Sequence, residues 1–414
     1  MPRLSRIDMT EATRLTREGR LQEAMALLQG ASPALATPPR HGKGPTARSS
    51  VPPIDMEPPS AGSGGAWTAP FASASSRDPE SARTSGDVPN ILRGLRDRLA
   101  GLGDLRAGAE GPFGSFGTAQ PPSQPDGARF EEHVYANAAG SRPYKLYVPS
   151  TLDDSPRPLV VMLHGCTQSP DDFAAGTRMN ELAEEFGLLV AYPAQTQAAN
   201  MSRCWNWFNA ADQQRDRGEP SLIAGITRTI MERHPVDPAR VYVAGLSAGG
   251  AKAAIMAATY PDLYAAVGVH SGLACGAARD MGSAFAAMRQ GGATPDPLAR
   301  PDGERAPTIV FHGDRDRTVH PVNGDQVAAQ ATAGTRHRIE VSRGRSSGGM
   351  DFTRTIHHDE AGLGRLEQWV LHGAGHAWSG GSPAGSYTDP RGPDASREML
   401  RFFLTHESAR PSRR

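Results

Sequence analysis

Short apolar runs alternate with amphipathic stretches from about residue 130 to residue 406 of this 414-residue chain. The apolar runs are almost continuous over four or five residues, which is typical of parallel strands that are buried on both faces. The predicted strands are 159–163, 188–192, 241–244, 265–269, 308–311 and 366–371, a hairpin is predicted from 130–136 and 143–149, and the predicted helices are 179–186, 221–233, 248–259, 322–333 and 396–406. This alternation predicts an α/β fold, in which helices cover both faces of a mostly parallel sheet.

The segments that precede this body have a different composition. Residues 1–30 are predicted to form a small helical segment, because apolar residues recur there at near-helical spacing. Residues 31–128 are rich in Pro, Ala, Ser and Gly and have no hydrophobic period. We therefore expect a mostly disordered linker with one short helix near 91–102. The folded domain is expected at 129–408.

Charge and composition exclude several classes of protein but do not change the predicted fold. Lys and Arg total 44, as do Asp and Glu, so the net charge is zero and no global field favours nucleic acid or anionic lipid. No run reaches the roughly 18 apolar residues that a transmembrane helix needs. The first residues lack the apolar core of a secretory signal. This lack predicts a cytoplasmic location. Three cysteines are too few for a disulfide scaffold.

Candidate chemistry begins at a G-x-S-x-G sequence over residues 245–249. It follows the predicted strand 241–244 and precedes an alanine-rich helical stretch, which is the context in which this pattern presents a nucleophile. The small residues allow a turn sharp enough to expose the Ser247 hydroxyl above the strand ends. We therefore predict Ser247 as a catalytic nucleophile, and the alternative is an ordinary turn serine.

A serine hydroxyl needs a base and a group that orients the base. In the α/β-hydrolase arrangement the acid follows the serine and the histidine comes last. His376, in a glycine-rich loop after the last predicted strand, is the predicted base. Asp316 is favoured as the acid over Asp314, because the chain must turn before a carboxylate faces the histidine. Asp314 is expected to cap its own turn, His372 is expected to pack, and the role of His270 is left open.

Acyl transfer also needs hydrogen-bond donors for the developing oxyanion. The backbone N–H of Ala248, directly after the nucleophile, is one candidate donor. The Cys166 N–H, in the loop after the predicted strand 159–163, is the other. The alternative for this loop is an ordinary strand-to-helix connection. A disulfide between Cys166 and Cys204 would stiffen it and would suit an oxidising compartment, at odds with the expected cytoplasmic location.

Aromatic residues gather at 204–208, which reads Cys-Trp-Asn-Trp-Phe in a chain with only 6% aromatic residues. This cluster either forms an apolar wall for an acyl chain or packs in the core, and the pattern favours neither. Trp205 and Trp207, together with Trp378 near the predicted base, are therefore candidate substrate-binding residues.

Together these motifs resemble those of the polyhydroxybutyrate (PHB) depolymerase family of α/β-hydrolase esterases. The motifs are H-G-C-T-Q at 164–168, C-W-N-W-F at 204–208, G-L-S-A-G-G at 245–250, H-G-D-R-D-R-T-V at 312–319 and G-H-A-W at 375–378. The resemblance covers about residues 130–406 and implies the α/β-hydrolase fold. It also implies the roles given above to Ser247, Asp316, His376, Cys166 and Ala248. No metal and no organic cofactor are implied, and no closely spaced ligand pattern such as H-E-x-x-H is present.

The resemblance also implies a substrate class. Members of this family hydrolyse esters of short-chain hydroxyalkanoates, so poly(3-hydroxybutyrate) or its oligomers are the expected substrates. Relatives of similar fold cleave feruloyl or acetyl groups from plant polysaccharides, which is the alternative. A non-catalytic, granule-associated scaffold is the alternative of another class, with the helix in 1–30 docking to a partner or a granule surface. Family members are often secreted, which leaves the compartment open.

Overall fold

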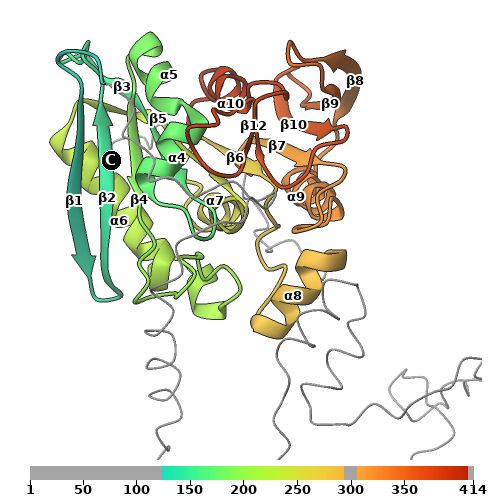
Figure 1. The fold of residues 1–414 in the computed structure, drawn as a ribbon, viewed down its shortest axis with the longest axis horizontal. Coiled ribbons are helices and arrows are strands. Elements are labelled where there is room, and N and C mark those ends of the chain that lie inside the picture. Colours follow the sequence, from blue (N-terminus) through green and yellow to red (C-terminus); the bar gives the residue numbers. More distant parts are fainter. Residues whose placement is uncertain (1–123, 293–304, 409–414) are drawn as a thin grey trace, which may run out of the picture. The chain divides into compact units, whose positions relative to one another are not determined.

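The computed structural model of the protein describes residues 124–292 and 305–408 (Figure 1). Predictions for the N-terminal part of the chain lie outside the described residues, apart from 124–128: the helical segment 1–30, the linker 31–128 and its short helix near 91–102.

Ten strands of the described chain form one sheet in the order β1-β2-β4-β3-β5-β6-β7-β10-β9-β8. The strands are β1 (Arg129–Asn137), β2 (Gly140–Val148), β3 (Arg157–Leu163), β4 (Leu189–Pro193), β5 (Val236–Leu246), β6 (Ala266–His270), β7 (Thr308–Gly313), β8 (Arg338–Arg345), β9 (Asp351–His358) and β10 (Gly364–Leu371). The block from β4 to β10 is parallel, and antiparallel strands extend it at both edges (Figure 1). The predicted α/β fold is confirmed.

Helices cover both faces of this sheet. They are α4 (Pro170–Thr177), α5 (Met179–Phe186), α6 (Gly218–Arg233), α7 (Ala248–Thr259), α8 (Met281–Gln290), α9 (Val322–Thr332) and α10 (Ala395–Phe403), with a short 3₁₀ helix η2 (Ala210–Gln213). Val161 and Leu163 of β3 belong to the core shared with α6, α7 and α9, whereas Val160 and Met162 belong to the core shared with α5 and α10. Successive strand residues thus serve opposite faces, which explains why the apolar runs are continuous.

The hydrophobic pattern predicts the central elements better than the edges. Helices α5 and α7 begin and end at the predicted residues. The pattern does not predict β8 and β9, because β8 lies at the sheet edge, is exposed along almost its whole length and carries three arginines. A second, two-stranded sheet pairs β11 (Trp378–Ser379) with β12 (Thr388–Asp389). No helix within 124–292 or 305–408 is long and apolar enough to span a membrane.

Candidate active site

Ser247 occupies a strained turn between β5 and α7. Its backbone lies at φ 57° and ψ −119°, which is unfavourable for any residue with a side chain. The turn is held by a hydrogen bond from the Ser247 N–H to the His270 carbonyl at 2.9 Å. A Cβ at Gly249 would lie 2.0 Å from the Leu163 carbonyl oxygen, so only glycine permits α7 to begin this close to β3. The sequence therefore forces the serine outward at the carboxyl ends of the strands.

Asp316, which is buried, and His376, which is partly buried, form a pair after the ends of β7 and β10. Nδ1 of His376 lies 2.7 Å from Oδ2 of Asp316. The other carboxylate oxygen, Oδ1, accepts the N–H groups of Thr318 and Val319, each at 2.9 Å. Burial alone would raise the pKa of the Asp316 carboxyl, but the hydrogen bond from His376 and those from the loop amides together hold it below its usual value. An ionised Asp316 orients the imidazole with its Nδ1–H toward the carboxylate.

Asp314 makes a second Asp–His pair nearby. Its carboxylate lies 3.0 Å from Nδ1 of His372 and accepts the Gly373 N–H at 2.7 Å. Both side chains of this pair are exposed to solvent, at 38% and 42%. The expectation that His372 packs is therefore wrong: it reaches outward and bonds to Asp314 instead. Asp314 braces the loop that leads to His376, rather than capping only its own turn.

His270 is neutral and fixed in place. It is fully buried and stacks between the rings of Phe311 and Trp378. Its Nε2 accepts the Ser379 N–H at 3.0 Å, while its carbonyl holds the Ser247 N–H. Burial lowers the pKa of His270 to about 3, so the ring stays an acceptor at neutral pH. This residue, whose role the sequence leaves open, links the nucleophile turn to the histidine loop.

The loop after β3 brings a free amide next to the nucleophile turn. The Gly165 N–H is taken by Oε1 of Gln168 at 2.9 Å, and the Thr167 N–H by the Ser202 carbonyl at 2.7 Å. Between them, the Cys166 N–H makes no hydrogen bond within the described part of the chain. A Cβ on Gly165 would lie 3.6 Å from Cβ of Ser247, so the loop borders the serine directly. Gln168 is a structural contributor that our sequence reasoning missed, although it ends the H-G-C-T-Q motif.

Ala248 supplies the second candidate donor. It is the first residue of α7, so its N–H has no acceptor within the helix. The amides at a helix N-terminus and the helix dipole together favour a negative charge at this point. The positions of the Cys166 and Ala248 amides therefore suit a developing oxyanion beside Ser247.

A disulfide joins Cys166 to Cys204. It ties the loop after β3 to the Cys-Trp-Asn-Trp-Phe segment, which is the pairing that the sequence left open. Cys275 is free and buried. No group of three or more His, Cys, Asp or Glu side chains in the described ranges is arranged to hold a metal ion.

The three candidate substrate-binding tryptophans lie inside the protein. Trp205 is fully buried and its indole N–H donates to the His164 carbonyl at 3.1 Å. Trp378 is 1% exposed and donates to Oγ of Ser396 at 3.0 Å. Trp207 is 5% exposed and packs edge-on against Phe208. Their candidate role in substrate contact is corrected here to core packing, because their burial leaves almost no surface for a ligand and the indole N–H groups of Trp205 and Trp378 are satisfied inside the protein.

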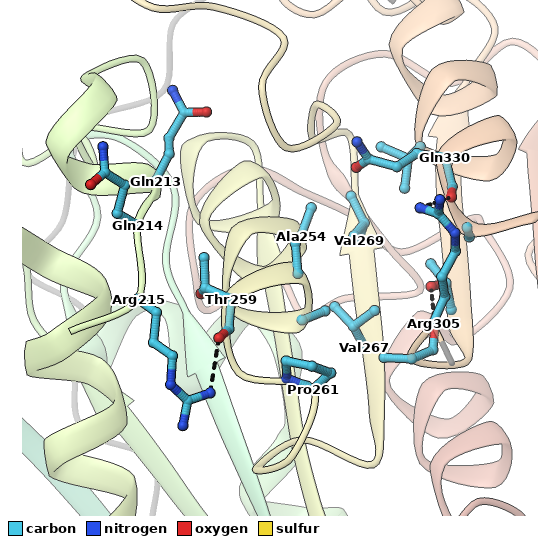
Figure 2. A pocket seen from close by; sticks show the side chains of 16 residues that line it. Gln213, Gln214, Arg215, Ala254, Thr259, Pro261, Val267, Val269, Arg305 and Gln330 are labelled. Atoms are coloured by element: carbon cyan, nitrogen blue, oxygen red, sulfur yellow. Dashed lines mark hydrogen bonds between the residues drawn. The ribbon is translucent and has the colours of Figure 1, made fainter. Parts of the chain in front are cut away.

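A separate cavity of about 400 Å³ lies beside α7, α9 and β6 (Figure 2). Figure 2 shows Arg215 and Arg305 on opposite sides of it, with Val267 and Val269 between them. None of the predicted triad or oxyanion residues lines this cavity. It is therefore distinct from the candidate active site.

Comparison with known proteins identifies the family to which this chain belongs. The model of the esterase PHB depolymerase family matches residues 142–349. Poly(3-hydroxyalkanoate) depolymerase C of Paucimonas lemoignei is 34% identical over 239 residues, which are 56% of this chain and 57% of that protein. Acetylxylan esterase A of Talaromyces purpureogenus is 30% identical over 202 residues, covering 45% of this chain and 52% of that protein. The chain thus spans little more than half the length of these two relatives.

Two further proteins are matched over most of their own length. Feruloyl esterase B of Thermothelomyces thermophilus is 29% identical over 248 residues, which are 56% of this chain and 82% of that protein. The structure of acetyl xylan esterase from Aspergillus awamori aligns with a TM-score of 0.53 and 21% identity, covering 67% of this chain and 99% of that one, and so shares the fold. On the match to the family model, this chain belongs to the PHB depolymerase family of esterases.

Proposed function

We propose that this protein is a serine esterase that hydrolyses short-chain hydroxyalkanoate esters, either poly(3-hydroxybutyrate) or its oligomers. The observation that carries the proposal is the hydrogen-bonded pair of buried Asp316 and partly buried His376. It accompanies a strained serine and two amides that have no acceptor within the described ranges. The substrate class rests on the similarity to a poly(3-hydroxyalkanoate) depolymerase.

The geometry supports a two-step mechanism. Asp316 accepts Nδ1–H of His376, so Nε2 is the basic nitrogen and takes the proton of Ser247 as its Oγ attacks the ester carbonyl. The Cys166 and Ala248 N–H groups stabilise the oxyanion, and each such donor is worth about 10²- to 10³-fold in rate. His376 then protonates the leaving alcohol. Water releases the acyl group from Ser247 by the same route.

The direct test is the rate of p-nitrophenyl butyrate hydrolysis by the full chain and by Ser247→Ala. We expect the variant to lose turnover while its thermal unfolding matches the wild type, because the change removes one hydroxyl. Wild-type turnover in this variant would contradict the assignment of Ser247 as the nucleophile. A folded wild type without hydrolysis would favour the scaffold alternative, although the relatives reported above are all named as enzymes.

A feruloyl- or acetyl-type carbohydrate esterase is the second candidate, favoured by the match to most of the length of a feruloyl esterase. The same fold and site chemistry serve either substrate. Comparing kcat/KM for 3-hydroxybutyrate trimers, methyl ferulate and acetylated xylan separates the two. Faster turnover of the trimer supports the proposal, and faster turnover of either carbohydrate-type ester supports the alternative.

A further inference from the structure

A buried carboxylate lies near the active site but outside the proposed triad. Glu219, in the first turn of α6, is 3% exposed. Its Oε2 accepts the backbone N–H of Asn206 at 2.9 Å and Nζ of Lys252 at 2.9 Å. Its Oε1 accepts the side-chain amides of Gln195 at 2.5 Å and Asn206 at 3.0 Å. These four residues, Glu219, Lys252, Gln195 and Asn206, are called the Glu219 network below.

Lys252 anchors this network to the helix that carries the nucleophile. It is completely buried on α7, which begins directly after Ser247. Its Nζ also donates to the Asp212 carbonyl at 2.8 Å, and the Asp212 carboxylate accepts the Glu219 N–H at 2.8 Å. A buried ion pair persists only when its remaining polar groups find partners. Both oxygens of Glu219 accept hydrogen bonds, Lys252 has two acceptors, and Arg142 adds a second cation 3.7 Å from Oε1 of Glu219.

Gln195 connects the network to the oxyanion loop. Its side-chain amide donates to Glu219 and to the Cys204 carbonyl, at 2.5 and 2.9 Å. Its backbone N–H donates to Nε2 of His164 at 3.0 Å. Because Nε2 is an acceptor, the hydrogen of this neutral ring is on Nδ1, which lies 2.7 Å from the Gly165 carbonyl oxygen. The imidazole therefore donates to that carbonyl.

The last link fixes a single peptide unit. The Gly165 carbonyl and the Cys166 N–H belong to one rigid, planar peptide group. A hydrogen bond that holds the carbonyl therefore also sets the direction of the N–H, which points the opposite way. The Gly165 carbonyl also accepts the Gln168 N–H at 3.4 Å, but the bond from His164 at 2.7 Å is the shorter of the two. The direction of the candidate oxyanion donor thus depends on His164, and through it on Gln195.

We propose that Glu219 is a positioning residue for the oxyanion hole, which acts through Gln195 and His164 to aim the Cys166 N–H at the developing oxyanion. The inference rests on the proposed esterase function. It differs from a role in stability alone, because the effect of Glu219 is then expressed in the transition state more than in substrate binding.

The test is Glu219→Gln in the full chain, with Glu367→Gln as the matched control. Glu367 is 4% exposed and paired with Arg354 and Arg401, but it lies in the middle of β10, outside the loop that carries His376. For Glu219→Gln we expect kcat for p-nitrophenyl butyrate to fall roughly 10- to 100-fold with KM changed less than about two-fold. The inhibition constant of butaneboronic acid, which forms a tetrahedral adduct on serine, is expected to rise by a similar factor.

A second variant, Gln195→Leu, removes the side-chain amide that joins Glu219 to residue 195, while the backbone N–H to His164 and the buried ion pair stay in place. It is expected to reproduce the losses of Glu219→Gln, whereas Glu367→Gln is expected to keep the wild-type kcat and boronate affinity per folded molecule. Wild-type kcat in both test variants, or an equal loss in the control, would overturn the proposal. So would failure of both test variants to fold beside a folded control. An inactive wild type would instead contradict the proposed esterase function itself.

Discussion

At the scale of single residues, burial distinguishes two Asp–His pairs that the sequence presents side by side. The side chains of Asp316 and His376 are 0% and 11% exposed, whereas those of Asp314 and His372 are 38% and 42% exposed. An exposed pair is screened by water and contributes little, while a buried one fixes both geometry and charge. The later position of Asp316 in its loop favours it in the sequence, but only the fold shows that the Asp314 pair is exposed.

This difference gives a paired prediction. Asp316→Asn is expected to lower kcat by roughly 10³- to 10⁴-fold, because an amide no longer holds His376 in the tautomer that accepts the serine proton. Asp314→Asn is expected to stay within about two-fold of the wild type, since it affects a solvent-exposed brace. Steady-state hydrolysis of p-nitrophenyl butyrate measures both. Equal losses in the two variants would contradict the assignment of the acid.

Other residue roles could not be predicted from sequence. Tryptophans are typical of both substrate-binding surfaces and protein cores. Only the burial of Trp205, Trp207 and Trp378 shows that they belong to the core. The His164 tautomer depends on a backbone amide from Gln195, a partner distant in sequence. Short motifs identify which residue types meet at a site, whereas the direction of each hydrogen bond depends on the packed loops.

At the scale of elements, the apolar pattern located the central strands and the helices α5 and α7. It failed at the exposed edge strand β8, which has no buried face to impose a period, and at its neighbour β9, which is only half-buried. The loops around the site lack a period as well, and the Cys166–Cys204 disulfide joins two of them across a sequence separation of 38.

Removal of this disulfide is expected to affect both stability and rate. Closing a loop of this length restricts the unfolded chain, so Cys204→Ser is expected to lower the free energy of unfolding by roughly 2–4 kcal/mol. A looser Cys166 loop is also expected to lower kcat severalfold. Guanidinium unfolding and ester hydrolysis under non-reducing conditions measure the two effects. Unchanged stability and kcat would show that the bond does not brace the loop.

At the scale of the whole molecule, buried neutral histidines make stability depend on pH. Burial lowers the pKa of His164 to about 4, against about 6.5 in an unfolded chain. The unfolded state therefore binds a proton first, so the contribution of His164 is present above pH ~6.5 and is lost as the pH falls toward 4. His164 alone accounts for about 3 kcal/mol of that loss.

The lowered pKa of the Asp316 carboxyl acts in the same direction at still lower pH, since its contribution is lost as it becomes protonated. Urea unfolding between pH 8 and pH 4 measures the contribution of His164, which is lost within that range. We expect the midpoint to fall steadily below pH 6.5. A midpoint that stays constant down to pH 4.5 would contradict the buried, neutral state of His164.

The central claim is that Ser247 is the nucleophile of a hydrolytic enzyme. Diethyl p-nitrophenyl phosphate reacts covalently with an activated serine, so peptide mass spectrometry of the treated full chain tests the claim most directly. We predict one diethylphosphoryl group, located on Ser247, with loss of esterase activity in proportion to labelling. Full activity after labelling of Ser247, or inactivation through a group attached to another residue, would contradict the account.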